Sequence, residues 1–112
     1  MDNPSLKQRA EHALNSIAQI KSFMKGVNED RFLKDVQLQS AVQYQFIIIG
    51  EAINNIDRSV LEKYDYPWHI PRTFRNFMAH GYHSIKMERV FYATQDLDTL
   101  ENKIMELIKN EF

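Results

Sequence analysis

The residues that could do chemistry are gathered in the short stretch RNFMAHGYH, residues 75–83. An arginine side chain is permanently charged and holds phosphate oxygens through two parallel hydrogen bonds. A histidine side chain ordinarily titrates near ~6.5, so it can accept or donate a proton at neutral pH. Arg75 and His80 therefore suit cleavage of RNA by its own 2′-hydroxyl group. The histidine would move a proton, the arginine would stabilise charge on the phosphorus, and no metal ion or cofactor is required.

Helical geometry predicts how these side chains meet. Asn76 and His80 are one turn apart, so they are neighbours on the surface of a helix. Arg75 is ~140° from His80 around the helix, but its long side chain can sweep across beside Asn76. Gly81 permits the left-handed turn that ends the helix. Tyr82 would then point toward the end of the helix that carries Arg75, Asn76 and His80. By spacing alone, a solvated helix face with a capping histidine is the commoner interpretation.

A composite site in a homodimer would overcome the limits of one histidine. A single imidazole does not easily serve as base and acid in the same reaction. A two-fold dimer would bring two Arg75–His80 pairs together across one cleft. The apolar run FIII, residues 46–49, belongs to a helix that is apolar around most of its circumference. Such a helix is either central in its bundle or buried against a partner chain, and we expect it to contribute to the dimer.

Composition places the chain among ordinary globular proteins. Of its 112 residues, 44% are hydrophobic and 26% are charged. It has no cysteine, which excludes disulfides, zinc–thiolate sites and iron–sulfur clusters. No apolar run approaches the ~20 residues needed to span a bilayer, and the N-terminus lacks a secretory pattern. We therefore expect a cytoplasmic protein with no membrane contact.

Charge limits how the protein could hold RNA. With 14 basic and 15 acidic residues, the formal net charge is -1. Proteins that grip nucleic acid over a broad face usually carry a basic excess. If RNA is the substrate, the basic groups must be concentrated locally.

Four segments with helical periodicity predict an all-α fold, an antiparallel four-helix bundle in which residues 1–112 form one domain. A capping-box pattern at residues 59–62 adds one short helical turn. The third helix begins between Pro67 and Pro71, and Gly50 would let another helix approach closely. The expected bounds of the four helices are residues 3–26, 28–56, 67–81 and 84–112.

Each helix has an apolar face that we expect to line the core. The first has apolar residues at alternating steps of three and four. The inward positions are Leu6, Ala10, Ala13, Ile17, Ile20 and Met24 in the first helix, and Leu38, Val42, Gln45, Ile49, Ala52, Ile53 and Ile56 in the second. In the third and fourth helices they are Ile70, Phe74, Phe77, Met78, Val90, Leu97, Leu100, Ile104, Leu107 and Ile108.

The stretch RNFMAHGY resembles the R-x4-H-x-Y motif of HepT-like toxins in the HEPN superfamily. IGEA at residues 49–52 and PW at residues 67–68 are similar to that branch in type and order. The resemblance covers nearly the whole chain. It implies a helical bundle, commonly dimeric, with metal-independent endoribonuclease activity.

The same resemblance implies roles for individual residues. Arg75 and His80 would be catalytic, and Asn76 would be a supporting polar residue. Tyr82 matches the tyrosine that receives adenylyl groups from a cognate minimal nucleotidyltransferase antitoxin. Bulky anionic groups beside the arginine would block RNA and compete for its charge.

Several other side chains allow two interpretations. Trp68 could stack with RNA bases or could close the open end of the bundle. Arg72 could extend the positive patch or could be merely solvated. Glu51 could pair with Arg75 or could be an ordinary surface residue. His69 and His83 could suggest a metal site with His80, but capping and surface roles explain them, and we predict no metal.

Two functions remain open at this stage. The first is a ribonuclease toxin with a composite homodimer site, RNA as substrate and a nucleotidyltransferase antitoxin as partner. The second is a catalytically inactive bundle that only binds a nucleotidyltransferase or a nucleotide. The intact Arg75–His80 pair favours the first, because a scaffold has no need of both side chains.

Overall fold

The computed structural model describes residues 3–80 and 85–112, with side chains from Leu6 onward. In these residues all regular secondary structure is helical, which confirms the predicted all-α fold class. None of these helices has the length and hydropathy needed to cross a membrane. The helices are α1 (Asn3–Phe23), α2 (Glu29–Lys34), α3 (Val36–Asn54), α4 (Arg58–Leu61), α5 (His69–His80), α6 (Met87–Gln95) and α7 (Asp98–Glu111).

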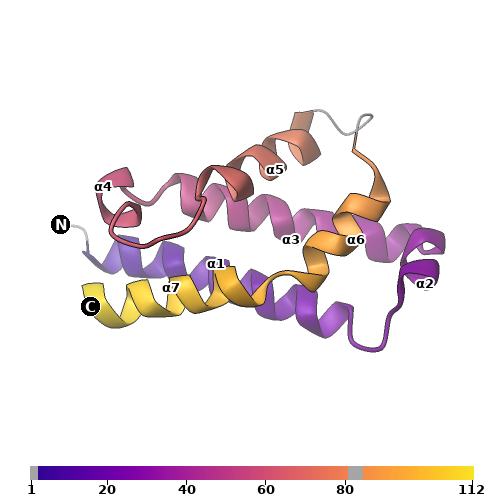
Figure 1. Cartoon of the computed structure of the whole chain (residues 1–112), viewed down its shortest axis with the longest axis horizontal. Helices are drawn as coiled ribbons and strands as arrows, with labels where there is room; N and C mark the ends of the chain where they lie inside the picture. The colour runs from indigo at the N-terminus through magenta and orange to yellow at the C-terminus, as the bar shows by residue number, and fades with distance from the viewer. Residues whose placement is uncertain (1–2, 81–84) are drawn as a thin grey trace.

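The long helices run antiparallel along an elongated body (Figure 1). α1, α3, α5 and the α6–α7 segment succeed one another up and down, as the bundle prediction requires. α3 packs against α1 on one side and α5 on the other, while α7 packs against α1. The start of α1 and the end of α7 lie at the same end of the molecule (Figure 1).

The predicted apolar faces form the core. Ala10, Ala13, Ile17 and Ile20 of α1 are completely buried, as their spacing predicts. On α3, the inward row Val42, Ile49, Ala52 and Ile53 is buried, and so is Phe46, which lies ~40° from Val42 on the same face of the helix. Because α3 lies between α1 and α5, its central position already accounts for much of its apolar circumference.

The second predicted helix is divided into two. The chain leaves helical geometry at Asp35, whose φ and ψ of -113° and 92° are extended. The Asp35 carboxylate accepts the backbone N–H of Leu38 at 3.0 Å, so it caps α3. Asn28 caps α2 as predicted, through a 2.9 Å bond from the backbone N–H of Arg31. The prediction of one continuous helix over residues 28–56 was wrong because a second cap interrupts it.

The fourth predicted helix is also divided, between α6 and α7. The break at residues 96–97 lets α6 turn to meet α2 while α7 runs along α1. Phe91 of α6 packs against Phe32 of α2, with ring centroids 5.9 Å apart. The inward positions Leu97, Leu100, Ile104 and Leu107 are buried as predicted, although they do not belong to one helix with Val90. A continuous helix could not satisfy both contacts.

The third predicted helix has the expected bounds but a different orientation. Met78 is buried and Phe74 is half-buried, as predicted. Ile70 and Phe77, however, are 50% and 49% exposed. Pro71 is buried instead, so α5 is rotated relative to the predicted orientation, with its Pro71 side toward α3. Part of its apolar stripe therefore remains on the surface.

The predicted extra turn is present as α4. Its bounds, Arg58–Leu61, begin one residue before the predicted capping box. Asp57 occupies the N-cap position and forms no side-chain capping hydrogen bond there. The short helix was therefore predicted correctly, but Ser59 is not its cap.

Candidate functional site

Gly50 fixes the position of Arg75. A Cβ atom at residue 50 would overlap the Cβ of Arg75 and would lie 2.8 Å from its Cγ. It would also lie 2.9 Å from the carbonyl oxygen of Pro71. The predicted close approach at Gly50 is therefore confirmed, and the stem of Arg75 is held against the backbone of α3.

The guanidinium of Arg75 lies between two acceptors. Its Nη2 atom forms an ion pair with Oε2 of Glu51 at 2.8 Å, and Nη1 donates to Oδ1 of Asn76 at 3.1 Å. Its Nε atom is buried and has no hydrogen-bond partner among the described residues. Because a guanidinium has five N–H groups, two on the terminal nitrogens remain for a ligand. The side chain is 27% exposed, so solvent reaches it.

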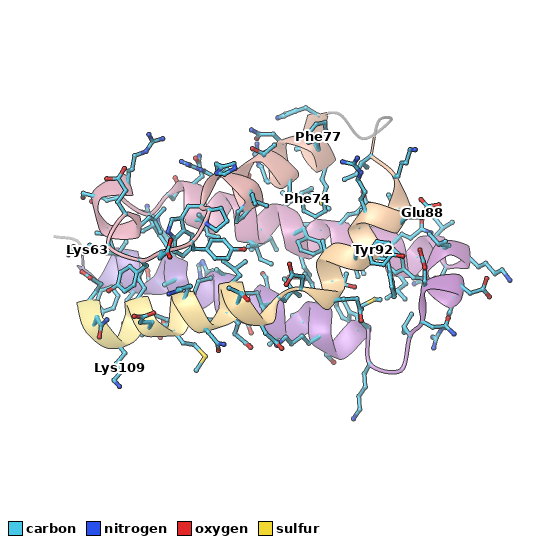
Figure 2. The ribbon with its side chains drawn as sticks, in the orientation of Figure 1. Lys63, Phe74, Phe77, Glu88, Tyr92 and Lys109 are labelled. Carbon is cyan, nitrogen blue, oxygen red and sulfur yellow. The ribbon has the colours of Figure 1, made fainter. Side chains whose placement is uncertain are left out.

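His80 lies on a shallow hollow at the C-terminal end of α5. Thr73, Asn76 and Phe77 line the same hollow, which has a volume of about 310 Å³. Figure 2 shows Phe77 near this end of α5 and Phe74 about one turn earlier, on the side that faces α6. His80 forms no side-chain hydrogen bond or ion pair among the described residues. His80 is exposed to solvent.

Asn76 connects the two parts of the site. It accepts a hydrogen bond from Arg75 and lines the hollow of His80. Arg75 is directed toward α3, whereas His80 is ~140° away around α5. The structure thus brings Arg75 together with Asn76, and Asn76 together with His80. It also shows the Arg75–Glu51 pair, which the sequence left open.

The predictions for Gly81, Tyr82 and His83 lie outside the described residues. The catalytic roles of Arg75 and His80 and the supporting role of Asn76 stay predictions, because geometry alone assigns no activity.

Trp68 packs inside the fold. It is 7% exposed, its Nε1 atom donates to the carbonyl oxygen of Tyr64 at 3.1 Å, and its ring contacts Tyr66. In this position it offers no face on which an RNA base could stack, so the structure favours its closing role over the RNA contact. Arg72 is half-buried on α5, and its predicted contact with RNA remains a prediction.

A network around Glu111 stabilises the framework. The hydroxyl of Tyr64 donates to Oε2 of Glu111 at 2.8 Å, and Lys63 lies 3.4 Å from its Oε1. The hydrogen bond from Tyr64 lowers the pKa of Glu111, and burial raises the pKa of Tyr64. This network ties the end of α7 to the chain after α4.

A second polar hollow lies beside Arg75, and sequence reasoning missed it. We call it the α1–α3 hollow; it is lined by Gln8, Arg9, His12, Ile48, Glu51, Ala52 and Asn55. The spacing of Arg9 and His12, three positions apart on one helix, could have indicated a shared polar face. The partner side chains on α3 could not have been inferred from it.

Over residues 3–80 and 85–112, no group of three or more His, Cys, Asp or Glu side chains is arranged to hold a metal ion.

Comparison with known proteins gives a consistent set of similarities. A protein-family model described as "Ribonuclease HepT-like" matches residues 13–107. A protein of Caldanaerobacter subterraneus named a "putative RNase" is 28% identical over 104 residues, covering 90% of this chain and 92% of that protein. A "putative RNase" of Methanocaldococcus jannaschii is 31% identical over 97 residues, covering 86% of this chain and 75% of that protein.

A longer protein is also similar. It is named "Gamma-glutamylcyclotransferase and putative RNase" in Methanocaldococcus jannaschii and is 30% identical over 100 residues. The match covers 88% of this chain but only 45% of that protein, so the chain spans less than half of that relative. No solved structure matches this chain at a comparable level.

Proposed function

The chain belongs to the HepT-like ribonuclease family, and from this premise we propose that it is a metal-independent endoribonuclease toxin. The observation that carries the proposal is the arrangement on α5. A partly exposed arginine is fixed by Glu51 and Asn76, and Asn76 shares a hollow with an exposed histidine. A permanent positive charge and a proton-transfer group beside open surface are what phosphodiester cleavage requires.

The proposed reaction uses the RNA as its own nucleophile. The 2′-oxygen attacks the adjacent phosphorus and loses its proton to a base. The bond from phosphorus to the 5′-oxygen breaks, and an acid protonates that leaving oxygen. The products are a 2′,3′-cyclic phosphate and a 5′-hydroxyl end. Arg75 would stabilise the additional negative charge on the phosphate oxygens, and His80 would supply one of the two proton transfers.

We infer that a homodimer completes this site. Each chain offers one His80 on the α5 surface, whereas the reaction needs a base and an acid. Phe77 lines the hollow of His80 and is half exposed, as is Ile70 on the same helix. A second copy that covers this apolar strip would bury it and bring a second His80 toward the same RNA.

We propose further that a nucleotidyltransferase antitoxin neutralises the enzyme by adenylylating Tyr82. Support comes from the R-x4-H-x-Y pattern, in which Tyr82 follows His80 by two residues. Added phosphate groups near Arg75 would compete with RNA for its guanidinium. The expected cytoplasmic location stays a prediction.

An RNA cleavage assay tests the proposal. The purified, unmodified protein, incubated with RNA and EDTA, should produce 2′,3′-cyclic phosphate ends. His80→Ala and Arg75→Ala should each lower the rate by at least ~10²-fold, the scale of general acid–base and charge stabilisation. Circular dichroism should show that both variants remain folded.

His69→Ala is the matched control, since His69 is an exposed histidine at the other end of α5. It should cleave RNA at the wild-type rate. RNA left intact by folded, unmodified wild type would instead support the second candidate, an inactive bundle that binds a nucleotidyltransferase or a nucleotide.

A further inference from the structure

The α1–α3 hollow is continuous with the Arg75 site through one side chain. Glu51 lines the hollow from α3 and also forms the ion pair with Arg75 on α5. A molecule that occupies the hollow would therefore lie next to the residue that holds the guanidinium. The two features form one surface that crosses α3 from α1 to α5.

The hollow offers one permanent cation to a ligand on a chain that lacks a basic excess. Arg9 lines it, and the negative charge of Glu51 is paired with Arg75. Arg9 donates from Nη1 to the backbone carbonyl of Asn55 at 3.0 Å, which holds its guanidinium at the C-terminal end of α3. Its other N–H groups remain available to an anion. Glu11 lines a separate shallow hollow with His12, so it borders this site without lining it.

The remaining lining suits one nucleotide. The volume of about 380 Å³ lies within the ~300–1,000 Å³ typical of small-molecule sites. Ile48 and Ala52 provide an aliphatic floor for a base or ribose. Gln8, His12 and Asn55 carry side-chain donors and acceptors that could bond to base edges or to a 2′-hydroxyl.

We propose that the α1–α3 hollow binds a ribonucleotide of the substrate strand next to the phosphate at Arg75, with Arg9 contacting the phosphate of that nucleotide. This inference rests on the proposed ribonuclease function and adds a binding subsite to it. The ligand chemistry is a ribonucleoside monophosphate unit, supplied by single-stranded RNA rather than by free nucleotide. Arg9 and His12 are binding residues in this proposal and take no part in the proton transfers.

Binding of a fluorescein-labelled single-stranded RNA, measured by anisotropy at several salt concentrations, tests the subsite. The parent protein in this assay is the His80→Ala variant, so that the RNA strand stays intact, and every other substitution is added to it. Adding Arg9→Gln should raise Kd roughly tenfold, as expected for loss of a charge-assisted bond. The slope of log affinity against log salt should become shallower by about 0.7, the contribution of one phosphate contact on a single strand. His12→Ala, which removes an exposed side chain, should raise Kd with little change in that slope.

Lys7→Gln is the matched control, because Lys7 is an exposed cation on α1 that does not line the hollow. Its Kd and salt slope should equal those of the parent. Equal weakening by Lys7→Gln and Arg9→Gln would indicate diffuse attraction and overturn the subsite. Unchanged binding in folded Arg9→Gln and His12→Ala variants would also overturn it.

Two further outcomes separate this proposal from the function on which it rests. If the parent binds RNA but Arg9→Gln binds equally well, only the subsite fails. If neither the parent nor wild type binds or cleaves RNA, the ribonuclease proposal itself fails. Adenosine 5′-monophosphate is titrated in parallel by calorimetry. Binding of this free nucleotide through Arg9, with RNA binding unaffected, would overturn the assignment to RNA.

Discussion

At the scale of single residues, the structure gives Arg75 a fixed direction rather than a large stabilising role. Its guanidinium is bonded to Glu51 and Asn76, yet the Arg75 and Glu51 side chains are 27% and 52% exposed. Exposed ion pairs are screened by water and salt and contribute little to folding. The pair therefore matters mainly because it fixes the direction of the guanidinium.

Glu51→Gln should accordingly lower the free energy of unfolding by less than about 1 kcal/mol. Urea unfolding followed by circular dichroism measures this difference. Glu62→Gln, which alters an exposed glutamate at the C-cap of α4, serves as the reference substitution. A loss well above that bound for Glu51→Gln would mean that the ion pair is a major element of the fold.

At the scale of helices, the contact between α3 and α5 positions the site. Gly50 brings the α3 backbone against the stem of Arg75 and the carbonyl of Pro71. Because this contact leaves no room for a side chain, any larger residue must move α5, and Arg75 moves with it.

Gly50→Ala should destabilise the protein by about 1–3 kcal/mol, the usual cost of overpacking, and should also reduce RNA cleavage by the folded fraction. Gly26→Ala is a matched glycine-to-alanine control. Gly26 has a φ of 73° and open space around its Cβ position, so strain of about 1–2 kcal/mol is expected without any movement of Arg75. Chemical unfolding measures the stability of each variant. The rate of RNA cleavage per folded molecule should be reduced in Gly50→Ala and unchanged in Gly26→Ala. Equal activity in both variants would contradict the positioning role of Gly50.

The contact between α7 and the segment after α4 should depend on pH. The hydrogen bond from Tyr64 lowers the pKa of Glu111 below its ordinary value of 4.5. A lowered carboxyl pKa contributes stability that is fully present above the ordinary value and is lost as pH falls through the lowered one. Tyr64→Phe should therefore lower the melting temperature at pH 7, and the difference from wild type should shrink as the pH falls below 4.5.

Tyr44→Phe provides the control for this experiment. Tyr44 is 61% exposed and its hydroxyl forms no hydrogen bond among the described residues, so its loss should not change the melting temperature at either pH. A Tyr64→Phe effect of the same size at acidic and neutral pH would show that packing, rather than the charge of Glu111, is responsible.

At the scale of the whole molecule, α5 lies at the edge of the bundle. It packs mainly against α3, and Ile70 and Phe77 remain half exposed. An apolar strip beside a candidate catalytic hollow fits the proposed homodimer, because the dimer would cover the strip and supply the second histidine.

Phe77→Glu should convert the proposed dimer to a monomer, since it places a charge within the apolar strip, and RNA cleavage should fall together with dimerisation. Light scattering after size-exclusion chromatography measures the mass. Met105→Glu, at a 53% exposed position on α7, should leave both the mass and the activity unchanged. A wild-type monomer at every concentration, or a dimeric Phe77→Glu variant, would refute the homodimer.

The sequence by itself determined the local features of this protein. The apolar seam of α1, the cap at Asn28, the bounds of α5 and the inward positions of α3 and α7 follow from periodicity and capping, which depend on near neighbours in the chain. The order of the R-x4-H-x-Y, GEA and PW motifs likewise indicated the ribonuclease family that the comparison shows.

Only the tertiary structure decided the rest. The break at residues 96–97 exists because one straight helix could not contact both α2 and α1. The rotation of α5, and the identity of Arg75 as the side chain that packs against Gly50, were hidden for a related reason. A helical wheel gives the angles between side chains but not the direction in which a neighbouring helix lies. The link from Arg9 through Glu51 to Arg75 joins three helices, so only their packing could bring it together.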